Sequence, residues 1–477
     1  MLMHRHSRKI FASCAALVVC ALALTAARAQ TRMPRVEFKE RTLANGIRVL
    51  SAVDKSSPTV AIQVWYKVGS KDDPDGRSGF AHLFEHIMFK STKNMKSEMM
   101  DRLTEDVGGM NNAFTADDVT VYYEVVPSNY LETLLWAEAD RMGALNVDDP
   151  NFKSERDVVK EEFRSRVLAP PYGRLFYLME QKSFAKHPYK RPGIGSIEEL
   201  DAATLTDVQN FHSTFYRPDN ATLVVVGDFD QPQLDAWVDK YLAKVPKPDK
   251  PLPRVTVKEP ARTGELRSVE FGQNVPLPAV AFTYLTPPKS DADIDALRVA
   301  EVILSGGESS RLYRTLVYEQ QIAQQVNAGN DLREDASLFT YLAILASEKK
   351  PEDAERALLA EIKKMQDAPV SPAELEKAKN QLVTGQLHER ETNNGKALAI
   401  GDAAVLLGDP QRVNTDLARL EKVTAADVQR VMKKYMTDTN RLVIYYLPES
   451  MKKPAGAGGV ETKSDGAANA TKGGESR

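Results

Sequence analysis

The sequence predicts an α+β fold made of two homologous lobes, each a mixed or antiparallel sheet packed with helices. A weak internal duplication is the first observation behind this prediction: DVQNFHSTFYRPDNATLVVVGDF starts at Asp207, and DVQRVMKKYMTDTNRLVIYYLPE starts at Asp427. Each segment predicts an amphipathic helix, a polar turn that ends in asparagine and an apolar strand. The spacing from Asp207 to Asn220 equals that from Asp427 to Asn440, which favours a true repeat over chance.

The order of elements within each half is the second observation. The first half opens with the strand-like segments IRVLSAV and TVAIQVWYKVG, and the second opens with LRSVEFGQ and PAVAFTYLTP. Helical patterns follow in both halves, for example LETLLWAEADRMGAL and AERALLAEIKKMQ. Strands followed by helices within one unit are typical of α+β lobes, in which helices pack on a sheet.

These elements place an N-terminal lobe at 30–245 and a C-terminal lobe at 262–448. Residues 246–261 lie in a stretch rich in proline and lysine, which predicts an extended linker. Residues 449–477 are rich in Gly, Ala, Ser and Lys and lack aromatic residues, so we expect a disordered tail. Residues 1–29 combine a basic start, a short apolar run and an Ala-x-Ala site, the pattern of a secretory signal peptide.

We therefore expect a periplasmic or secreted protein with no membrane span after signal cleavage; an uncleaved anchor is the less favoured alternative. The formal net charge of -3 gives no reason to expect a nucleic-acid partner. Both cysteines, Cys14 and Cys20, lie in the predicted signal peptide. The mature chain would then have no disulfide and no thiolate ligand, so any metal must be bound by His, Asp or Glu.

The segment GFAHLFEHIMF predicts a helix that carries a metal-binding pattern. His82 and His86 are four residues apart, about one helical turn, so they share a face and can bind one zinc ion. Glu85 lies on the flank of that face, where it can take a proton from a water molecule without binding the metal. The alternative is a pair of partly buried helix histidines beside a surface glutamate.

A second predicted helix, residues 151–167, offers the missing ligand. Glu155 and Glu162 are seven residues apart and share a face, and Val159 between them indicates that this face is partly buried. A carboxylate in apolar surroundings needs a partner, which a cation would provide. Glu161 is the competing ligand, and a solvated charged face is the alternative for the whole helix. Taken together with the two histidines, the pattern favours Glu162.

These residues resemble the metal motif of a known family. H-x-x-E-H at residues 82–86, followed by Glu162 76 residues after the second histidine, is similar to the pitrilysin/insulinase-type zinc peptidases, the inverzincins. Residues 108–127, GGMNNAFTADDVTVYYEVVP, resemble that family's GG-x-x-NA-x-T segment, which precedes a substrate-pairing edge strand. The resemblance covers about 37–448 and implies two lobes that form a clamshell.

The resemblance also implies a role for each matching residue. His82, His86 and Glu162 would bind one Zn²⁺ per chain, although manganese or cobalt in the same site is left open. Glu85 would be the general base, and Glu155 would orient the metal ligands without binding the metal itself.

The strand segment would bind the substrate. Asn112 and Ala113 would offer main chain and an amide to an extended peptide, which adds a strand to an open sheet edge. Such binding selects unfolded or flexible chains. An ordinary strand after a Gly108-Gly109 turn is the alternative, and both interpretations can hold together.

The second lobe departs from the family's pattern. The region that corresponds to the metal motif, DALRVAEVILSGG, has no histidine, so this lobe is expected to be a degenerate copy without a metal site. Active single-chain members carry an Arg and a Tyr seven residues apart in this lobe, at positions that here hold Val317 and Gln324. Arg311 and Tyr318 have the same spacing but lie six residues too early, and Arg314 is another possible stand-in.

This departure resembles two-chain members such as the mitochondrial processing peptidase, in which one chain carries the zinc. It implies a related partner subunit that carries the Arg/Tyr pair, or else a homodimer. The sequence thus predicts an exported zinc-dependent metallo-endopeptidase that cleaves peptides or unfolded polypeptides. The alternative is a non-catalytic scaffold or core subunit built on the same fold, against which the intact Glu85 and Glu162 argue.

Overall fold

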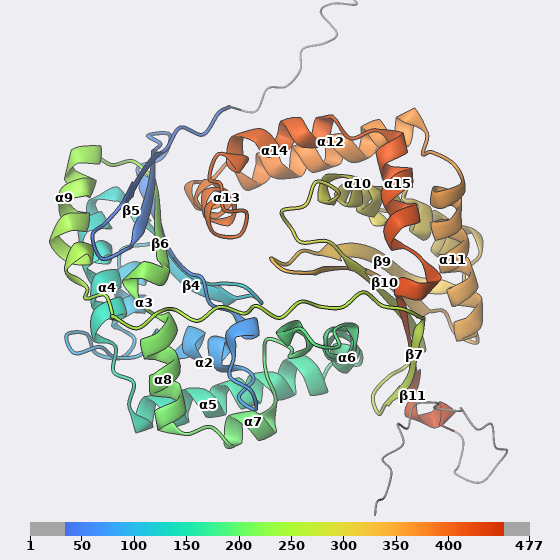
Figure 1. Cartoon of the computed structure of the whole chain (residues 1–477), viewed down its shortest axis with the longest axis horizontal. Helices are drawn as coiled ribbons and strands as arrows, with labels where there is room; N and C mark the ends of the chain where they lie inside the picture. The colour runs from blue at the N-terminus through green and yellow to red at the C-terminus, as the bar shows by residue number, and fades with distance from the viewer. Residues whose placement is uncertain (1–33, 453–477) are drawn as a thin grey trace, which may run out of the picture.

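The computed structural model describes residues 34–452, which form two sheet-containing lobes (Figure 1). The predicted signal peptide lies outside the described residues. Of the predicted tail, only residues 449–452 are described, and Glu449–Met451 form a short 3-10 helix. Within residues 34–452, no helix is both long and apolar enough to cross a membrane.

The first lobe contains a six-stranded mixed sheet in the order β1-β2-β6-β3-β5-β4. All neighbouring strands are antiparallel except the parallel pair β2 and β6. The strands are β1 (Lys39–Thr42), β2 (Arg48–Val53), β3 (Thr59–Tyr66), β4 (Met110–Thr115), β5 (Thr120–Pro127) and β6 (Ala221–Gly227). β4 is therefore an edge strand of this sheet.

The second lobe contains a five-stranded sheet in the order β7-β11-β8-β10-β9, again with one parallel pair, β7 and β11. The strands are β7 (Leu266–Gly272), β8 (Ala279–Thr286), β9 (Ala323–Asp331), β10 (Ser337–Leu345) and β11 (Arg441–Pro448). This order matches β2-β6-β3-β5-β4 of the first sheet strand for strand. The predicted α+β class, with two mixed sheets packed with helices, is confirmed.

Helices pack against both sheets. In the first half they are α2 (Phe80–Ile87), α3 (Met99–Glu105), α4 (Leu131–Ala144), α5 (Asp149–Phe163), α6 (Gly173–Ser183), α7 (Ile197–Asp201), α8 (Leu205–Phe215) and α9 (Gln231–Tyr241). In the second half they are α10 (Ile294–Ser305), α11 (Pro351–Asp367), α12 (Pro372–Glu389), α13 (Asn393–Val405), α14 (Arg412–Glu421) and α15 (Ala425–Tyr435).

The helices α8 and α15 show why the two DVQ segments look alike. Thr204 and Thr424 are the N-cap residues, and each side chain accepts a hydrogen bond from the backbone N–H of the aspartate three residues later. Asp207 and Asp427 accept in return from the backbone N–H of the capping threonine. This reciprocal pair satisfies two helix-terminal donors, so the spacing that the two halves share begins at a helix start in both of them.

Each sheet has one face covered by helices of its own half and one covered by a helix of the other half. In the first sheet, alternate residues of β3 separate the two cores: Val64 packs with the helices of the first half, whereas Trp65 packs with α13. In the second sheet, Phe282 of β8 packs with the helices of the second half and Ala281 packs with α6. Figure 1 shows α13 beside the first sheet and α6 at the second lobe.

The segment 246–261 between the lobes contains no helix or strand and crosses from one lobe to the other (Figure 1). Three charged side chains anchor this segment and its end to both lobes. Arg254 donates to the carbonyl of Lys67, and Glu259 accepts from the backbone N–H groups of residues 185–187. Arg262 donates to carbonyls on both sides of the joint. These contacts hold the second part of the segment and its end against the lobes.

Candidate metal and active site

The helix α2 starts at a buried turn that its sequence favours. Gly79, the N-cap, has φ +89°, and a Cβ there would lie 2.9 Å from the carbonyl oxygen of Ile194, so glycine suits this position. The buried Asp73 accepts hydrogen bonds from the N–H groups of Gly79 (2.7 Å) and Ala81 (2.8 Å), which are free helix-terminal donors. The apolar face of α2 is buried in the first core, and the opposite face carries the predicted ligands.

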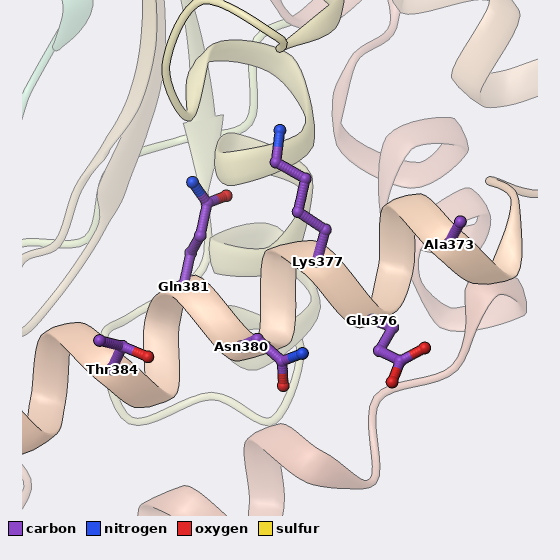
Figure 2. Close-up of a pocket in the computed structure, with 6 residues that line it drawn as sticks. All are labelled: Ala373, Glu376, Lys377, Asn380, Gln381 and Thr384. Carbon is purple, nitrogen blue, oxygen red and sulfur yellow. The ribbon is translucent and has the colours of Figure 1, made fainter.

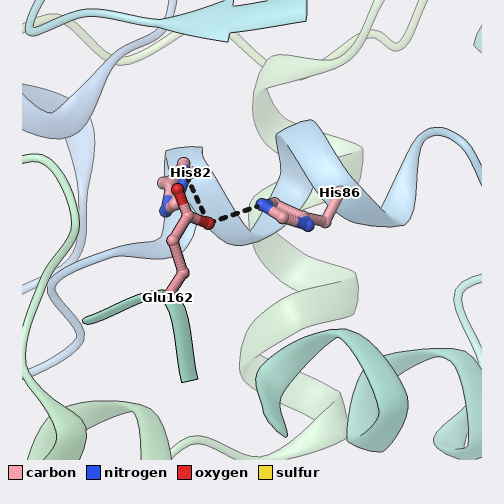
Figure 3. A group of neighbouring side chains, drawn as sticks. All are labelled: His82, His86 and Glu162. Atoms are coloured by element: carbon pink, nitrogen blue, oxygen red, sulfur yellow. Dashed lines mark ion pairs between the residues drawn. The ribbon is translucent and has the colours of Figure 1, made fainter. Parts of the chain in front are cut away.

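His82 and His86 meet Glu162 at one point (Figure 3). The Nε2 atoms of His82 and His86 lie 3.6 Å and 3.3 Å from Oε2 of Glu162, and one ligand atom from each residue lies within 4.8 Å of the others. Glu162 comes from α5, whose Phe152 and Val159 anchor it in the same core. Two imidazole nitrogens and one carboxylate oxygen that converge in this way are the donors a catalytic zinc ion takes, so the residues present fit the metal.

Burial and the carboxylates act differently on the two imidazoles. Burial lowers the pKa of His82 to about 4. Burial also lowers the pKa of His86, but hydrogen bonds to Glu155 and Glu162 outweigh it and raise that pKa to about 9. A metal binds neutral imidazole, so metal binding would displace a proton from His86.

Glu155 and Glu162 each face an imidazole with one carboxylate oxygen and a cation with the other. Glu155 directs Oε2 at Nδ1 of His86 (3.6 Å) and Oε1 at Nζ of Lys90 (2.9 Å). Glu162 directs Oε1 at Nη1 of Arg166 (2.7 Å), which leaves Oε2 for the two histidines. Neither cation was predicted from the sequence. Arg166 lies four residues after Glu162, the spacing of neighbours on a helix, whereas Lys90 follows the end of α2 and reaches Glu155 on another helix.

Glu85 lies between the two histidines in sequence and outside the converging group. Burial raises the pKa of Glu85, and a hydrogen bond from Thr115 offsets only part of that rise. Thr115 ends β4, and its hydroxyl also lies 3.5 Å from the carbonyl of Ala81, so the edge strand contacts the metal-binding helix. Thr115 belongs to the GG-x-x-NA-x-T segment, but the sequence pattern predicts no role for its hydroxyl.

Asn112 and Ala113 lie in the edge strand β4, opposite Tyr123 and Tyr122 of β5. Within residues 34–452, β4 pairs only with β5, so its other side is unpaired. The N–H of Ala113 donates to the side-chain Oδ1 of its own neighbour Asn112 (2.8 Å). That amide is therefore outside the ladder with β5, on the side where another strand could pair.

The segment that differs from the family's Arg/Tyr pattern belongs to the second lobe. Val317 is partly buried against the second core, and Gln324 is exposed at the start of β9. Arg311 donates to both carboxylate oxygens of Glu374 near the start of α12, at 2.8 Å and 3.0 Å. Tyr318, seven residues after Arg311, is 76% exposed. Arg311 therefore pairs with a carboxylate of its own lobe, which does not favour it as a stand-in for the family's arginine.

A separate surface pocket lies along α12 (Figure 2). It is lined by Ala373, Glu376, Lys377, Asn380, Gln381 and Thr384. Lys377 and Gln381 bond to the loop after α10, and none of the six is a predicted site residue. We assign this pocket no part in the chemistry.

Comparison with known proteins identifies the family. The family profile described as Insulinase (Peptidase family M16) matches residues 48–195, and the one described as Peptidase M16 inactive domain matches residues 202–382. A protein named Zinc protease PqqE, from Helicobacter pylori, is 32% identical over 427 residues, which cover 88% of this chain and 94% of that protein. This chain belongs to the M16 peptidase family.

Other M16 proteins agree with the assignment. A probable mitochondrial-processing peptidase subunit beta from Arabidopsis thaliana is 27% identical, covering 84% of this chain and 77% of that one. The crystal structure of a protease from Helicobacter pylori superposes with a TM-score of 0.84 at 30% identity, over 87% of this chain and 100% of that one. The periplasmic protease PqqL from Escherichia coli shares the fold, with a TM-score of 0.70 at 19% identity over 87% of this chain and 48% of that one. The resemblance drawn from the sequence motifs is confirmed.

Proposed function

We propose that this M16 protein is an exported zinc-dependent metallo-endopeptidase that cleaves peptides or unfolded polypeptides. The observation that carries the proposal is the convergence of His82, His86 and Glu162 beside Glu85. Relatives that are named zinc proteases support the metal and the reaction class. A scaffold would have no use for a half-buried carboxylate next to the donor group, so this alternative is not favoured.

The residues of the site have distinct tasks. His82, His86 and Glu162 would hold zinc, which when bound supplies a Lewis acid that acidifies water and polarises a peptide carbonyl. Glu85 takes a proton from the attacking water and returns it to the departing amine. Oε2 of Glu155 faces Nδ1 of His86 at 3.6 Å, and its negative charge favours a proton on Nδ1, which leaves Nε2 directed at Glu162.

The unpaired side of β4 defines the substrate class. An extended peptide can pair with this edge through main-chain hydrogen bonds, with the Ala113 amide released from its contact with Asn112. Peptides and unfolded chains present such extended segments along their whole length, whereas a folded protein pairs most of its main chain internally. We therefore infer that the substrates are peptides or unfolded chains.

The second lobe supports a partner. Val317 and Gln324 cannot place a cation and a phenol near a tetrahedral intermediate, so a related subunit with an Arg/Tyr pair, or a second copy of this chain, would complete the site. A relative named as a peptidase subunit supports this proposal. Export rests on the predicted signal peptide, and the fold is shared with a periplasmic protease.

The test is a cleavage assay on residues 30–477 with a pool of unstructured peptides, with zinc determined on the same sample. We expect about one zinc per chain and cleavage that is lost in Glu85→Gln while the zinc remains. Zinc without cleavage leads to the second arm, in which a related Arg/Tyr chain is added; activity and co-elution are then expected. Neither zinc nor cleavage in either arm would favour the scaffold.

A further inference from the structure

The two sheets meet through the turns at the ends of their edge hairpins. The β4–β5 turn, residues 116–119, and the β9–β10 turn, residues 332–336, point toward each other between the lobes (Figure 1). The backbone N–H of Glu334 donates to Oδ2 of Asp118 at 2.9 Å, which joins the two turns directly. We call the charged side chains at this junction the inter-lobe ion cluster: Lys71, Asp117, Asp118, Arg333, Glu334 and Asp335.

Lys71 is the central cation of the cluster. Its side chain is only 8% exposed, and Nζ lies 2.7 Å from Asp118, 2.8 Å from Glu334 and 3.3 Å from Asp335. Asp118 belongs to the first lobe, whereas Glu334 and Asp335 belong to the second. A buried ammonium is stable only where carboxylates compensate it, so Lys71 holds the two turns together.

Arg333 makes the reciprocal contact from the second lobe. Its side chain is 3% exposed, and its guanidinium lies 2.9 Å from Asp117 of the β4–β5 turn. The same guanidinium lies 5.1 Å from the ring centres of Phe184 and Tyr189. The hydroxyl of Tyr189 donates to Asp118 at 2.5 Å, which closes the cluster from a third side.

Residues of the first lobe also contact the β4–β5 turn. Ser70 donates its backbone N–H to the carbonyl of Ala116 (3.2 Å) and its hydroxyl to Asp117 (2.7 Å). Gly69 lies so close that a Cβ there would be 2.3 Å from the Ala116 oxygen. The turn is therefore held on both sides, and it follows Thr115, the last residue of β4, without any intervening residue.

We propose that the second lobe, which lacks the metal motif, positions the peptide-binding edge of the first lobe through the inter-lobe ion cluster. Lys71 and Glu334 are positioning residues. They fix the β4–β5 turn and, through it, the position of β4 relative to α2. The inference rests on the proposed function, because it assigns β4 to substrate binding. It gives the second lobe a task in the reaction although it supplies no metal ligand.

Glu334 is the residue to change. It is 25% exposed and pairs with Lys67 (2.5 Å) and Lys71 (2.8 Å), so its neutralisation weakens the cluster while Asp118 and Asp335 still compensate Lys71. Glu270 provides a matched control. It is 23% exposed and pairs with Lys182 of α6 at 3.0 Å, so it also links the two halves, but from β7.

The experiment compares wild type, Glu334→Gln and Glu270→Gln by hydrogen–deuterium exchange of residues 110–127 in the zinc-loaded protein without substrate. We expect exchange in this segment to rise about fivefold or more in Glu334→Gln and to stay unchanged in Glu270→Gln. Peptide cleavage should show a raised KM with kcat largely kept, and zinc content should not change. Exchange and KM equal to wild type in Glu334→Gln, or equal changes in Glu270→Gln, would overturn the proposal.

The exchange measurement keeps this inference separate from the proposed function. If wild type cleaves no peptide, the proposed function fails, yet the exchange comparison still decides whether the cluster holds β4. If Glu334→Gln does not fold, Lys67→Met replaces it, because Lys67 is the more exposed of the two lysines on Glu334, at 33% against 8%. A smaller rise in exchange at residues 110–127 is then expected, and no rise would refute the coupling.

Discussion

The packing of α13 on the first sheet makes opposite predictions for two helical glycines. Gly401 lies inside α13, and a Cβ built there would be 2.2 Å from Cε2 and 2.4 Å from Nε1 of Trp65. Gly385 lies inside α12, and a Cβ there would have no other heavy atom within 4 Å. Alanine at either site should gain about 0.5–1 kcal/mol from helix propensity. Only Gly401→Ala must also displace the indole ring.

The indole ring has little freedom to move. Trp65 is 3% exposed, and its N–H donates to Gln63 Oε1 at 2.9 Å. Gln63 donates in turn to Asn394 Oδ1 at 2.8 Å, near the start of α13. A shift of the ring therefore breaks a buried hydrogen-bond chain between the halves. Overpacking in a close-packed core costs about 1–3 kcal/mol, which exceeds the propensity gain.

We expect Gly401→Ala to lower the free energy of unfolding by about 1–2 kcal/mol and Gly385→Ala to raise it by about 0.5–1 kcal/mol. Urea unfolding followed by tryptophan fluorescence gives both values, with equal slopes as the check that unfolding remains comparable. If Gly401→Ala unfolds at the same urea concentration as wild type or at a higher one, α13 does not pack on Trp65 as described.

Three further predictions concern the site and the joint between the halves. Glu162→Gln should bind zinc at least about 10-fold more weakly in a chelator competition, because the donor oxygen loses its charge; unchanged affinity would remove Glu162 from the ligand set. Lys90→Met should weaken zinc binding about 10-fold, because Lys90 holds Glu155, which faces the ligand His86. Lys90→Arg should recover the affinity, and Lys93→Met, at an exposed neighbour, should leave it unchanged. Equal effects of both methionine variants would refute a role of Lys90 in positioning Glu155. Burial tends to raise the pKa of Asp54, but its hydrogen bond with Lys396 of α13 outweighs this and lowers the pKa from 3.8 to about 2. Since the folded pKa is lowered, the stabilisation from Asp54 is present above about pH 3.8 and is lost as the pH falls through about 2. Urea unfolding measured between these pH values should therefore show a smaller loss of stability in Asp54→Asn than in wild type.

Local spacing explains what could be predicted from the sequence. His82 and His86 share a face because they are one turn apart on α2, and Glu162 reaches them because α5 buries Val159 in the same core. The repeated helix starts follow from threonine and aspartate three residues apart. Each of these features depends on a few neighbouring residues.

The contacts between the halves could not be predicted in the same way. The helices α6 and α13 each cover the sheet of the other half, and their own amphipathic patterns do not say which sheet they meet. The inter-lobe ion cluster joins Lys71 to Glu334 across 263 positions of sequence, and each residue alone looks like an ordinary surface charge. Tertiary contacts of this kind have no local pattern.

An anomalous difference map at the zinc edge, from crystals of the zinc-loaded protein, tests the ligand set directly. We expect one peak about 2.0–2.2 Å from Nε2 of His82, Nε2 of His86 and a carboxylate oxygen of Glu162. We also expect Glu85 to lie outside the coordination sphere and to face its open position. A peak elsewhere, or Glu85 as a ligand in place of Glu162, would show that the proposed metal site is wrong.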